Sequence, residues 1–382
     1  MKILIVRCYP SYMDVVNNTY NIQELGLAKA LVRKGQICDL LFWTDSENKD
    51  VKVEFDDNKI VNVYYRKGIT FLKNTIYKDC DELFDRYDVI QTAEYNQIQS
   101  WILAHRKNCI IYHGPYYSSF NKRYNFMCRF FDAFFKNYYI KSNTKFITKS
   151  ELAKQFLINK GIKEQNVKTI GVGIDVQMLG DENNVCTDNV YNEMLNDKDE
   201  IKLLYIGRIE ERRNILFILD VFAELKKEYD NIRLYIIGSG EKEYEILVDD
   251  KIKELKIDND VVWQRKIQQK YLSNIYKLSD IFLLPTKYEI FGMVILEAMY
   301  YGTVVITTQN GGSNTLIKNN ENGIIYDELD KNKWAQAIKH ILLNQKLKLE
   351  IEKNAHDTIC EKYTWDAMAL QFIEQYNNLN HV

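Results

Sequence analysis

Short apolar runs alternate with amphipathic, helix-like stretches along the first half of the chain. The clearest helical stretch covers residues 22–34 and stops at Gly35, and glycine is the usual residue just past a helix end. The apolar runs have the length of buried strands. They cover residues 3–6, 38–42, 88–91, 109–112 and 146–148. This alternation predicts a parallel sheet with helices on both faces.

The same alternation restarts in the second half, after a polar segment. Residues 180–200 are rich in Asp, Asn and Glu and poor in apolar residues, which predicts a linker or surface excursion and a domain boundary near Gly173. Helical stretches such as 215–229 and 272–278 then separate a second set of predicted strands. These strands cover residues 201–206, 233–237, 261–263, 281–284 and 304–307.

The fold class predicted from these patterns is α/β, with two doubly wound, Rossmann-like domains facing a central cleft. Ligands of such sheets bind beyond the carboxyl ends of the strands. The expected domains are 1–173 and 174–362, and an aromatic C-terminal helix within 363–382 is expected to return to the first domain. A chain of 382 residues is too long for one ordinary core, which agrees with two domains.

Composition narrows the class of protein. A formal net charge of −2 gives no global basic field, so nucleic acid is not an expected partner. The N-terminal apolar run is too short for a signal peptide, and no apolar run reaches membrane-spanning length. The seven cysteines stand singly, without the spacing of a zinc or redox motif, and are interpreted as reduced thiols. We therefore expect a cytoplasmic protein.

The loop after the predicted strand 201–206 carries Gly207, Arg208 and Arg213. Glycine lets a ligand approach the backbone, and guanidinium groups match phosphate oxygens. A solvated charged turn is the alternative. The loop after strand 233–237 carries Gly238 and Ser239, which is a ligand contact or a tight turn; it lacks the third glycine of a dinucleotide fingerprint.

The strongest constellation surrounds Glu289 and Glu297. A strand runs to Pro285, Glu289 stands in the following loop, and a helix is predicted to begin near Gly292, where free amides favour phosphate. Eight residues separate the carboxylates, roughly 12 Å along a helix, which suits sugars at both ends of a diphosphate. In the alternative, Glu289 interacts with the helix N-terminus and Glu297 is solvated. The apolar neighbours of Glu297 weigh against that alternative, because a buried Glu needs a partner.

These residues resemble a known family. The Glu-x7-Glu spacing, the embedded Glu-x-Phe-Gly and the preceding strand are similar to retaining glycosyltransferases of family 4, which have the GT-B fold. Further matches extend along the chain. They are Gly207-Arg208, residues 236–240, Asn310-Gly311-Gly312, Asn322-Gly323, Tyr112-His113-Gly114 and residues 171–175.

The resemblance implies a role for each matching residue. Glu289 would bind donor-sugar hydroxyls near the reacting carbon, and Glu297 the ribose hydroxyls. Arg208 and Arg213 would hold the diphosphate and stabilise its charge as it leaves. His113 would contact the donor sugar from the first domain. The remaining donor-site residues implied are Gly207, Gly238, Ser239, Phe291, Gly292, Met293 and Val294.

The chain also departs from the family pattern. Arg213 stands at the usual lysine and Asn214 at the usual following glycine. The glycine pair common after the first strand is absent, which leaves Asn18 and Thr19 as candidates on the acceptor side.

The resemblance implies transfer with retention from a nucleotide-sugar, with a UDP-sugar favoured. The acceptor is expected to be a glycan, a lipid-linked glycan or a protein, in bacterial surface polysaccharide or glycoconjugate synthesis. We expect no cofactor and no metal, because arginines and helix amides supply the positive charge. The Asp258-Asn259-Asp260 run has the spacing of a metal-binding motif, but it precedes a predicted strand rather than ending one. A nucleotide-sugar epimerase of the same fold and a non-catalytic subunit of a glycosyltransferase complex remain as alternatives.

Residues 120–140 form a basic, aromatic, amphipathic stretch. Such a helix can lie on an anionic membrane surface, or it can pack against the first domain. Peripheral membrane contact through this segment is therefore one of two interpretations. The residues concerned are Lys122, Arg123, Phe126, Arg129, Phe130, Phe131, Phe134, Phe135, Lys136, Tyr138 and Tyr139.

Overall fold

The computed structural model describes residues 1–17, 22–179, 188–197 and 200–379. The chain divides into two compact units, which are described separately. Unit 1 comprises Met1–Asp175 and Tyr363–Val382, and unit 2 comprises Val176–Lys362. The acceptor-side candidates Asn18 and Thr19 lie outside the described residues.

Unit 1 is built on an eight-stranded sheet in the order β10-β9-β8-β7-β1-β2-β4-β3. All neighbouring strands are parallel except β3, which pairs antiparallel with β4 at the edge. The strands are β1 (Lys2–Val6), β2 (Ile37–Trp43), β3 (Lys49–Phe55), β4 (Lys59–Arg66), β7 (Val89–Ala93), β8 (Cys109–His113), β9 (Lys145–Thr148) and β10 (Val167–Thr169). The strand order runs outward in both directions from β1 and β7, so the doubly wound prediction is confirmed for this unit.

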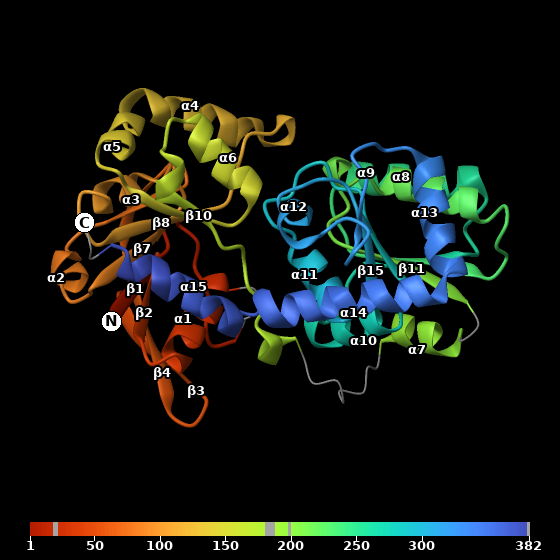
Figure 1. Ribbon diagram of the computed structural model, residues 1–382, viewed down its shortest axis with the longest axis horizontal. Coiled ribbons are helices and arrows are strands. Elements are labelled where there is room, and N and C mark those ends of the chain that lie inside the picture. The colour runs from red at the N-terminus through yellow and green to blue at the C-terminus, as the bar shows by residue number, and fades with distance from the viewer. Residues whose placement is uncertain (18–21, 180–187, 198–199, 380–382) are drawn as a thin grey trace. The chain divides into compact units, whose positions relative to one another are not determined.

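Helices and one hairpin complete unit 1 (Figure 1). The hairpin pairs β5 (Gly68–Phe71) with β6 (Asn74–Tyr77). The helices are α1 (Gln23–Arg33), α2 (Asp81–Phe84), α3 (Ile98–Leu103), α4 (Lys122–Phe134), α5 (Lys136–Lys141), α6 (Glu151–Asn159) and α15 (Trp365–Asn377). The last helix lies against α1, where the ring of Trp365 packs on Gly26 and Gly173.

Unit 2 contains a six-stranded, fully parallel sheet in the order β13-β12-β11-β14-β15-β16. Counted from β11, this is the 3-2-1-4-5-6 order of a doubly wound nucleotide-binding fold. The strands are β11 (Ile201–Ile206), β12 (Ile232–Ile237), β13 (Val261–Gln264), β14 (Ile281–Leu284), β15 (Val304–Thr307) and β16 (Ile324–Ile325). Apart from Ile201 at the start of β11, the apolar side chains of β11, β12, β14 and β15 are buried, as expected for a sheet covered on both faces.

Helices connect the strands of unit 2 (Figure 1). They are α7 (Asn189–Asn196), α8 (Ile215–Leu225), α9 (Lys242–Leu255), α10 (Leu272–Lys277), α11 (Met293–Tyr300), α12 (Ser313–Leu316), α13 (Lys331–Leu343) and α14 (Gln345–Lys362). The predicted helix start at Gly292 is confirmed, since Gly292 is the N-cap residue of α11.

One sequence-based expectation was wrong in detail, and one hairpin was not predicted. Part of the expected linker is the helix α7, which Asp188 caps and which buries Val190 and Met194 despite its polar composition. The hairpin of β3 and β4 was not among the predicted strands, because its alternating side chains are half exposed and lack a continuous apolar run. Its turn at 56–58 has three consecutive positive φ angles.

Candidate functional site

The predicted donor site gathers at one edge of the unit 2 sheet. Strands β11 and β14 are parallel neighbours, so the loops that follow them leave the sheet at the same edge. These loops are joined by hydrogen bonds. The Asn214 side chain donates to the Pro285 carbonyl at 2.6 Å, the Lys287 amide donates to the Arg212 carbonyl at 3.0 Å, and the Arg212 guanidinium donates to the Tyr288 carbonyl at 2.5 Å. The two loops therefore form one unit.

Charged side chains pair at this junction. Arg213 Nη1 lies 2.5 Å from Glu289 Oε2, and Arg212 Nη1 lies 3.8 Å from the same oxygen. Glu210 lies 2.6 Å from Arg212 Nη2 and 3.7 Å from Arg213 Nε. Two guanidinium groups thus face two carboxylates. Arg208 is exposed and, within the described parts of the chain, makes no ion pair, so its charge is available to an anion.

Asn214 preserves the backbone shape that a glycine would give. Its φ of 53° lies in the left-handed region, which Asn tolerates better than most residues. Glycine adopts this region readily too, so the φ angle here is one that both residues allow. Its side chain adds the hydrogen bond to Pro285, which a glycine could not make.

Two glycines, Gly311 and Gly312, pack against the loop that carries Glu289. Gly311 donates its amide to the Glu289 carbonyl at 3.0 Å. A Cβ on Gly311 would lie 2.2 Å from the Ile290 carbonyl oxygen, and one on Gly312 would lie 1.5 Å from the Phe291 carbonyl oxygen. Asn310, which is buried, accepts hydrogen bonds from the amides of Gly312 and Ser313. The contact explains why this turn consists of glycines and fixes the position of Glu289.

The helix α11 begins directly after this loop. No side chain caps it, because its N-cap residue Gly292 has none, so its first amides are left for another acceptor. Met293 and Val294 in this first turn are partly exposed. Uncapped amides and the helix dipole together favour an anion.

Glu297 lies deeper in the same helix than its expected role requires. Its exposure is 1%, and its Oε2 accepts a hydrogen bond of 2.9 Å from the Tyr276 hydroxyl. The sequence-based expectation that Glu297 is buried and has a partner is met. The structure gives Glu297 a protein partner and does not bring its carboxylate to the surface.

The glycines after β11 and β12 pack against each other. A Cβ on Gly238 would lie 1.9 Å from the Gly207 carbonyl oxygen, and one on Gly240 would lie equally close to the Ile209 carbonyl oxygen. The two loops are bonded, since the Ile209 amide donates to the Ser239 carbonyl at 3.2 Å. Close backbone approach is therefore one reason for these glycines. The Ser239 side chain is exposed.

In unit 1, His113 stands at the carboxyl edge of the sheet with Glu94 and Lys149. These residues end or follow the neighbouring strands β8, β7 and β9. His113 is fully buried, and its Nδ1 lies 2.9 Å from Glu94 Oε2. The same oxygen accepts the Gly114 amide at 2.9 Å, and Lys149 Nζ lies 3.5 Å from the other oxygen.

This arrangement fixes the proton on His113. Burial by itself raises the pKa of Glu94, but Lys149, His113 and the Gly114 amide together hold that pKa below its ordinary value. An ionised carboxylate can only accept, so Nδ1 of the ring donates to it. The Tyr95 amide points its N–H at Nδ1 as well, at 3.2 Å, a bond that needs the other tautomer, but the charged oxygen is closer and is the stronger partner. Nε2 is buried and has no partner among the described residues.

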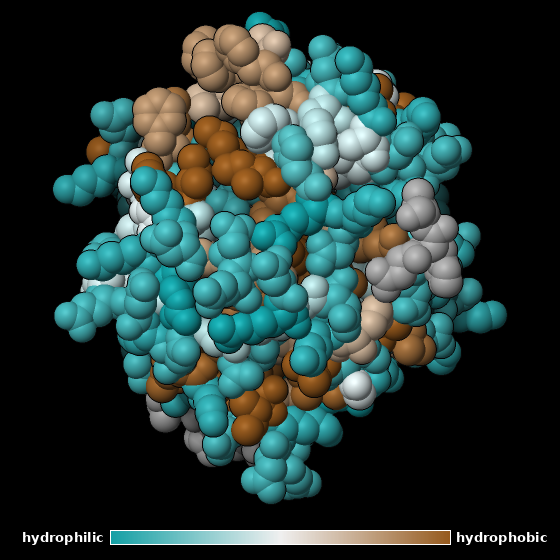
Figure 2. All heavy atoms as spheres, turned by 90° about the vertical axis from the view of Figure 1, so that its left-hand side faces the viewer, coloured by the Kyte–Doolittle hydropathy of each residue, from teal (hydrophilic) through white to brown (hydrophobic). Residues whose placement is uncertain are grey.

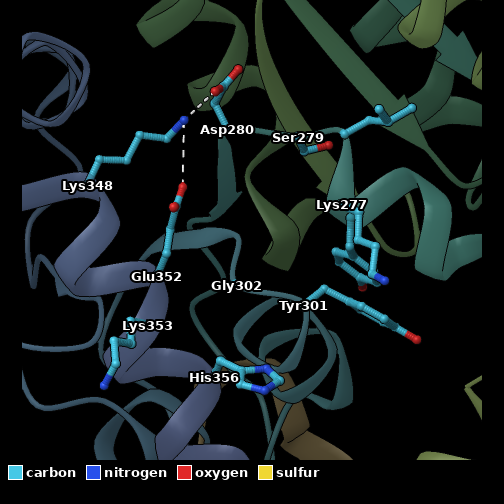
Figure 3. A pocket seen from close by; sticks show the side chains of 11 residues that line it. Lys277, Ser279, Asp280, Tyr301, Gly302, Lys348, Glu352, Lys353 and His356 are labelled. Carbon is cyan, nitrogen blue, oxygen red and sulfur yellow. Dashed lines mark hydrogen bonds and ion pairs between the residues drawn. The ribbon is translucent and has the colours of Figure 1, made fainter. Parts of the chain in front are cut away.

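A separate cavity of about 400 Å³ lies at the opposite, amino ends of β14 and β15 (Figure 3). Lys348 reaches across part of it, 2.5 Å from Asp280 and 3.6 Å from Glu352. Burial raises the pKa of Glu352, an effect that Lys348 opposes. None of the predicted donor-site residues lines this cavity, so it is distinct from the site at the carboxyl edge.

The sequence did not single out several residues of these clusters. Glu210 and Arg212 stand beside the chosen arginines, but nothing local shows which guanidinium faces Glu289. Glu94 and Lys149 each follow a buried strand, and that position was the available signal. Across the described ranges, no cluster of His, Cys, Asp and Glu has the arrangement of a metal site.

Comparison with known proteins shows which family the chain resembles. Residues 188–358 match the family model of glycosyl transferases group 1. An uncharacterized glycosyltransferase of Methanocaldococcus jannaschii is 25% identical over 377 residues, which is 92% of each chain. A capsular polysaccharide biosynthesis glycosyltransferase of Staphylococcus aureus is 27% identical over 239 residues, 61% of each chain.

Solved structures extend the likeness to both units. The Anabaena protein HepE, solved in complex with UDP, superposes with a TM-score of 0.73 over 99% of this chain and 100% of its own, at 15% identity. At that identity the likeness concerns the fold. These comparisons show that residues 188–358 resemble the group 1 glycosyltransferases, and that the chain has the GT-B fold of two Rossmann-like domains.

Proposed function

We propose that the chain is a family 4 enzyme that transfers a hexose from a nucleotide-diphosphate sugar to an acceptor hydroxyl, with retention of anomeric configuration. The observation that supports this proposal most strongly is the Arg213–Glu289 ion pair. It joins two loops that are also hydrogen-bonded to each other, beside the uncapped start of α11. A carboxylate suits sugar hydroxyls, and the cations and amides suit a diphosphate.

The arginines and the helix amides would act most strongly while the bond between the sugar and the diphosphate breaks. Arg208 and Arg213 would bind the diphosphate together with the backbone amides of residues 291–294. The nucleotide would contact Gly207, Gly238 and Ser239. Because Glu289 pairs with Arg213, binding of the diphosphate would redistribute this pairing. Charge that grows on the leaving group is stabilised by such preorganised donors.

The proposed transfer takes place on one face of the sugar. The bond between the anomeric carbon and the diphosphate oxygen breaks, and a bond from the acceptor oxygen to that carbon forms on the same side. The acceptor proton passes to the departing diphosphate. No metal is proposed, since arginines and amides supply the positive charge.

Two further residues have proposed contacts. The lone pair on His113 Nε2 would accept a hydrogen bond from a donor-sugar hydroxyl, and Glu94 would hold the ring in that tautomer. Glu297 would bind ribose hydroxyls, in exchange for or alongside its bond from Tyr276.

Relatives guide the choice of substrates. The UDP bound to HepE supports UDP as the donor nucleotide. The Staphylococcus aureus relative named for capsular polysaccharide biosynthesis supports a glycan or lipid-linked acceptor in surface polysaccharide synthesis. A cytoplasmic location would give access to nucleotide-sugars.

The test is a panel of UDP- and GDP-sugars in which nucleotide release is followed for the wild type and Glu289→Gln. We expect release from one donor, and a loss of about 10²-fold or more in the variant. The variant should still bind the nucleoside diphosphate, because removing the carboxylate releases Arg213. Glu211→Gln, a change of an exposed carboxylate in the same loop, is the matched control.

The panel also separates the outcomes. If no donor releases its nucleotide, or if Glu289→Gln keeps full activity, the proposal is contradicted. Interconversion of a nucleotide-sugar without any acceptor would indicate an epimerase instead. Proton NMR of the product then tests stereochemistry, and an inverted linkage would reject retention.

A further inference from the structure

The helix α4 is apolar on two opposite sides. Its inner side buries Cys128 and Phe131 in a core cluster with Tyr95, Tyr139 and Phe146. This packing is one of the two interpretations of the basic, aromatic segment, and it is correct for the inner side. It leaves the outer side unexplained.

The outer side exposes three phenylalanines at a spacing of four residues. Phe126, Phe130 and Phe134 are 70%, 55% and 69% exposed, and the rings of Phe130 and Phe134 are 5.1 Å apart. In Figure 2, hydrophobic side chains gather at the level at which α4 and α5 lie in Figure 1. A row of exposed aromatic rings on one helix marks an interaction surface.

The charge around this row has one sign. Residues 120–141 contain five basic residues and one acid, Asp132. Asp132 is engaged by Lys160 and by the Tyr95 hydroxyl. Arg123 and Arg129, on the exposed side of α4, form no ion pair with any described residue. Aromatic rings flanked by unpaired cations match an anionic lipid surface.

A cavity of about 190 Å³ adjoins the same helix. Arg123 of α4 lines it, and Leu72 and Lys73 at the tip of the β5–β6 hairpin line it from the other side. Gln97 also lines it; this residue is buried, and its Oε1 has no partner among the described residues.

The hairpin tip has an unusual conformation for its residues. Leu72 and Lys73 both have left-handed φ angles, 47° and 63°, where Asn and Gly are usual. Phe71 and Leu72 are nevertheless exposed. A strained turn that presents apolar side chains and a lysine to solvent is consistent with contact to a surface.

We propose that unit 1 docks on an anionic lipid bilayer through the outer side of α4. The rings of Phe126, Phe130 and Phe134 then lie at the boundary between the lipid headgroups and the acyl chains. Arg123 and Lys73 then lie at the level of the lipid phosphates, at the rim of the cavity. Burial of apolar rings and attraction to anionic lipid act together in such binding. No described helix has the length and apolar character needed to cross the bilayer, so the contact is peripheral.

This inference goes beyond the proposed function and does not depend on the donor chemistry. The test is flotation of the purified full chain with vesicles of equimolar phosphatidylcholine and phosphatidylglycerol. We expect binding at low salt, weaker binding to pure phosphatidylcholine, and weakening by high salt.

Two variants separate the contributions. Phe126→Ser/Phe130→Ser/Phe134→Ser should weaken binding by about ten-fold or more. Arg123→Gln/Arg129→Gln should weaken it about 30-fold, from about 1 kcal/mol for each cation near the surface. Both variants should keep the thermal midpoint and the donor hydrolysis of the wild type. Ile246→Ser/Leu247→Ser/Leu370→Ser, which removes three apolar side chains that are 53–60% exposed elsewhere, is the control.

Three results would overturn the proposal. They are the absence of vesicle binding by the wild type, equal binding by the phenylalanine variant, and a self-associated wild type that the phenylalanine variant converts to monomer. The last result would assign the surface to a second copy of the chain. Vesicle binding by a protein without transferase activity would support the membrane surface while contradicting the proposed function.

Discussion

Replacing Gly312 by alanine should disable the enzyme while leaving it folded. Gly312 has helical dihedral angles, φ −73° and ψ −54°, so alanine adds no backbone strain. Its Cβ would nevertheless lie 1.5 Å from the Phe291 carbonyl oxygen, whereas real Cβ atoms keep at least 3.0 Å. One of the two loops must therefore move by about 1.5 Å.

The displaced loop carries Glu289 and leads into α11. A misplacement of about 1 Å can cost about 10²-fold in turnover, so kcat should fall by at least that factor. Overpacking should cost about 1–3 kcal/mol of stability. Turnover with the donor found in the panel, together with a urea unfolding curve, measures both effects.

Gly302→Ala is the matched control for this prediction. Gly302 has a φ of +76°, so alanine costs about 1–2 kcal/mol in strain. Its Cβ would meet nothing closer than 3.8 Å, and the Glu289 loop stays in place. Equal loss of turnover in both variants, or full turnover in Gly312→Ala, would refute the reasoning.

Three further predictions concern charge, hydrogen bonding and packing. The pKa of Glu94 lies below its ordinary value of 4.5, so its charge stabilises the fold above that pH and the contribution is lost as the pH falls through the folded pKa. Thermal midpoints followed down to about pH 3 should therefore fall less in Glu94→Gln than in the wild type, and equal slopes would contradict this. Tyr276→Phe removes the bond to Glu297 and should cost about 0.5–1.5 kcal/mol in urea unfolding; unchanged stability would contradict a stabilising role for this bond. Gly26→Ala should lower the thermal midpoint although alanine favours helices, because its Cβ would lie 2.4 Å from the Trp365 ring; a raised midpoint would show that the ring yields.

Most strands of the parallel sheets were predictable because they are buried on both faces, whereas β4, β10 and β16 were not predicted. Strands buried on both faces appear as short apolar runs, and runs separated by helices imply the doubly wound order. The β3–β4 hairpin was missed because partial exposure breaks that signal. The helix α7 was missed because two buried residues suffice to anchor it within a polar segment.

The sequence could indicate candidate residues within single loops, but not the contacts between loops. Glu289, Arg208, Arg213 and the start of α11 each lie at a strand end or helix start. The pairing of Arg213 with Glu289 joins residues 76 apart, and sequence spacing does not specify such a contact. The same limit hid the partner of His113, since Glu94 comes from a different strand. The burial of Glu297 was predictable from its apolar neighbours, but its partner Tyr276 comes from a different helix and was not.

The most direct test of the central claim is calorimetric titration of UDP and uridine into the wild type and Arg213→Met. We predict that UDP binds more tightly than uridine, and that the variant weakens UDP by about ten- to a hundred-fold while leaving uridine unchanged. Arg233→Met, which removes another ion-paired arginine at the amino half of β12, should leave both affinities unchanged. Failure of UDP, GDP and ADP alike to bind, or undiminished UDP binding by Arg213→Met, would contradict a diphosphate site at this edge of the sheet.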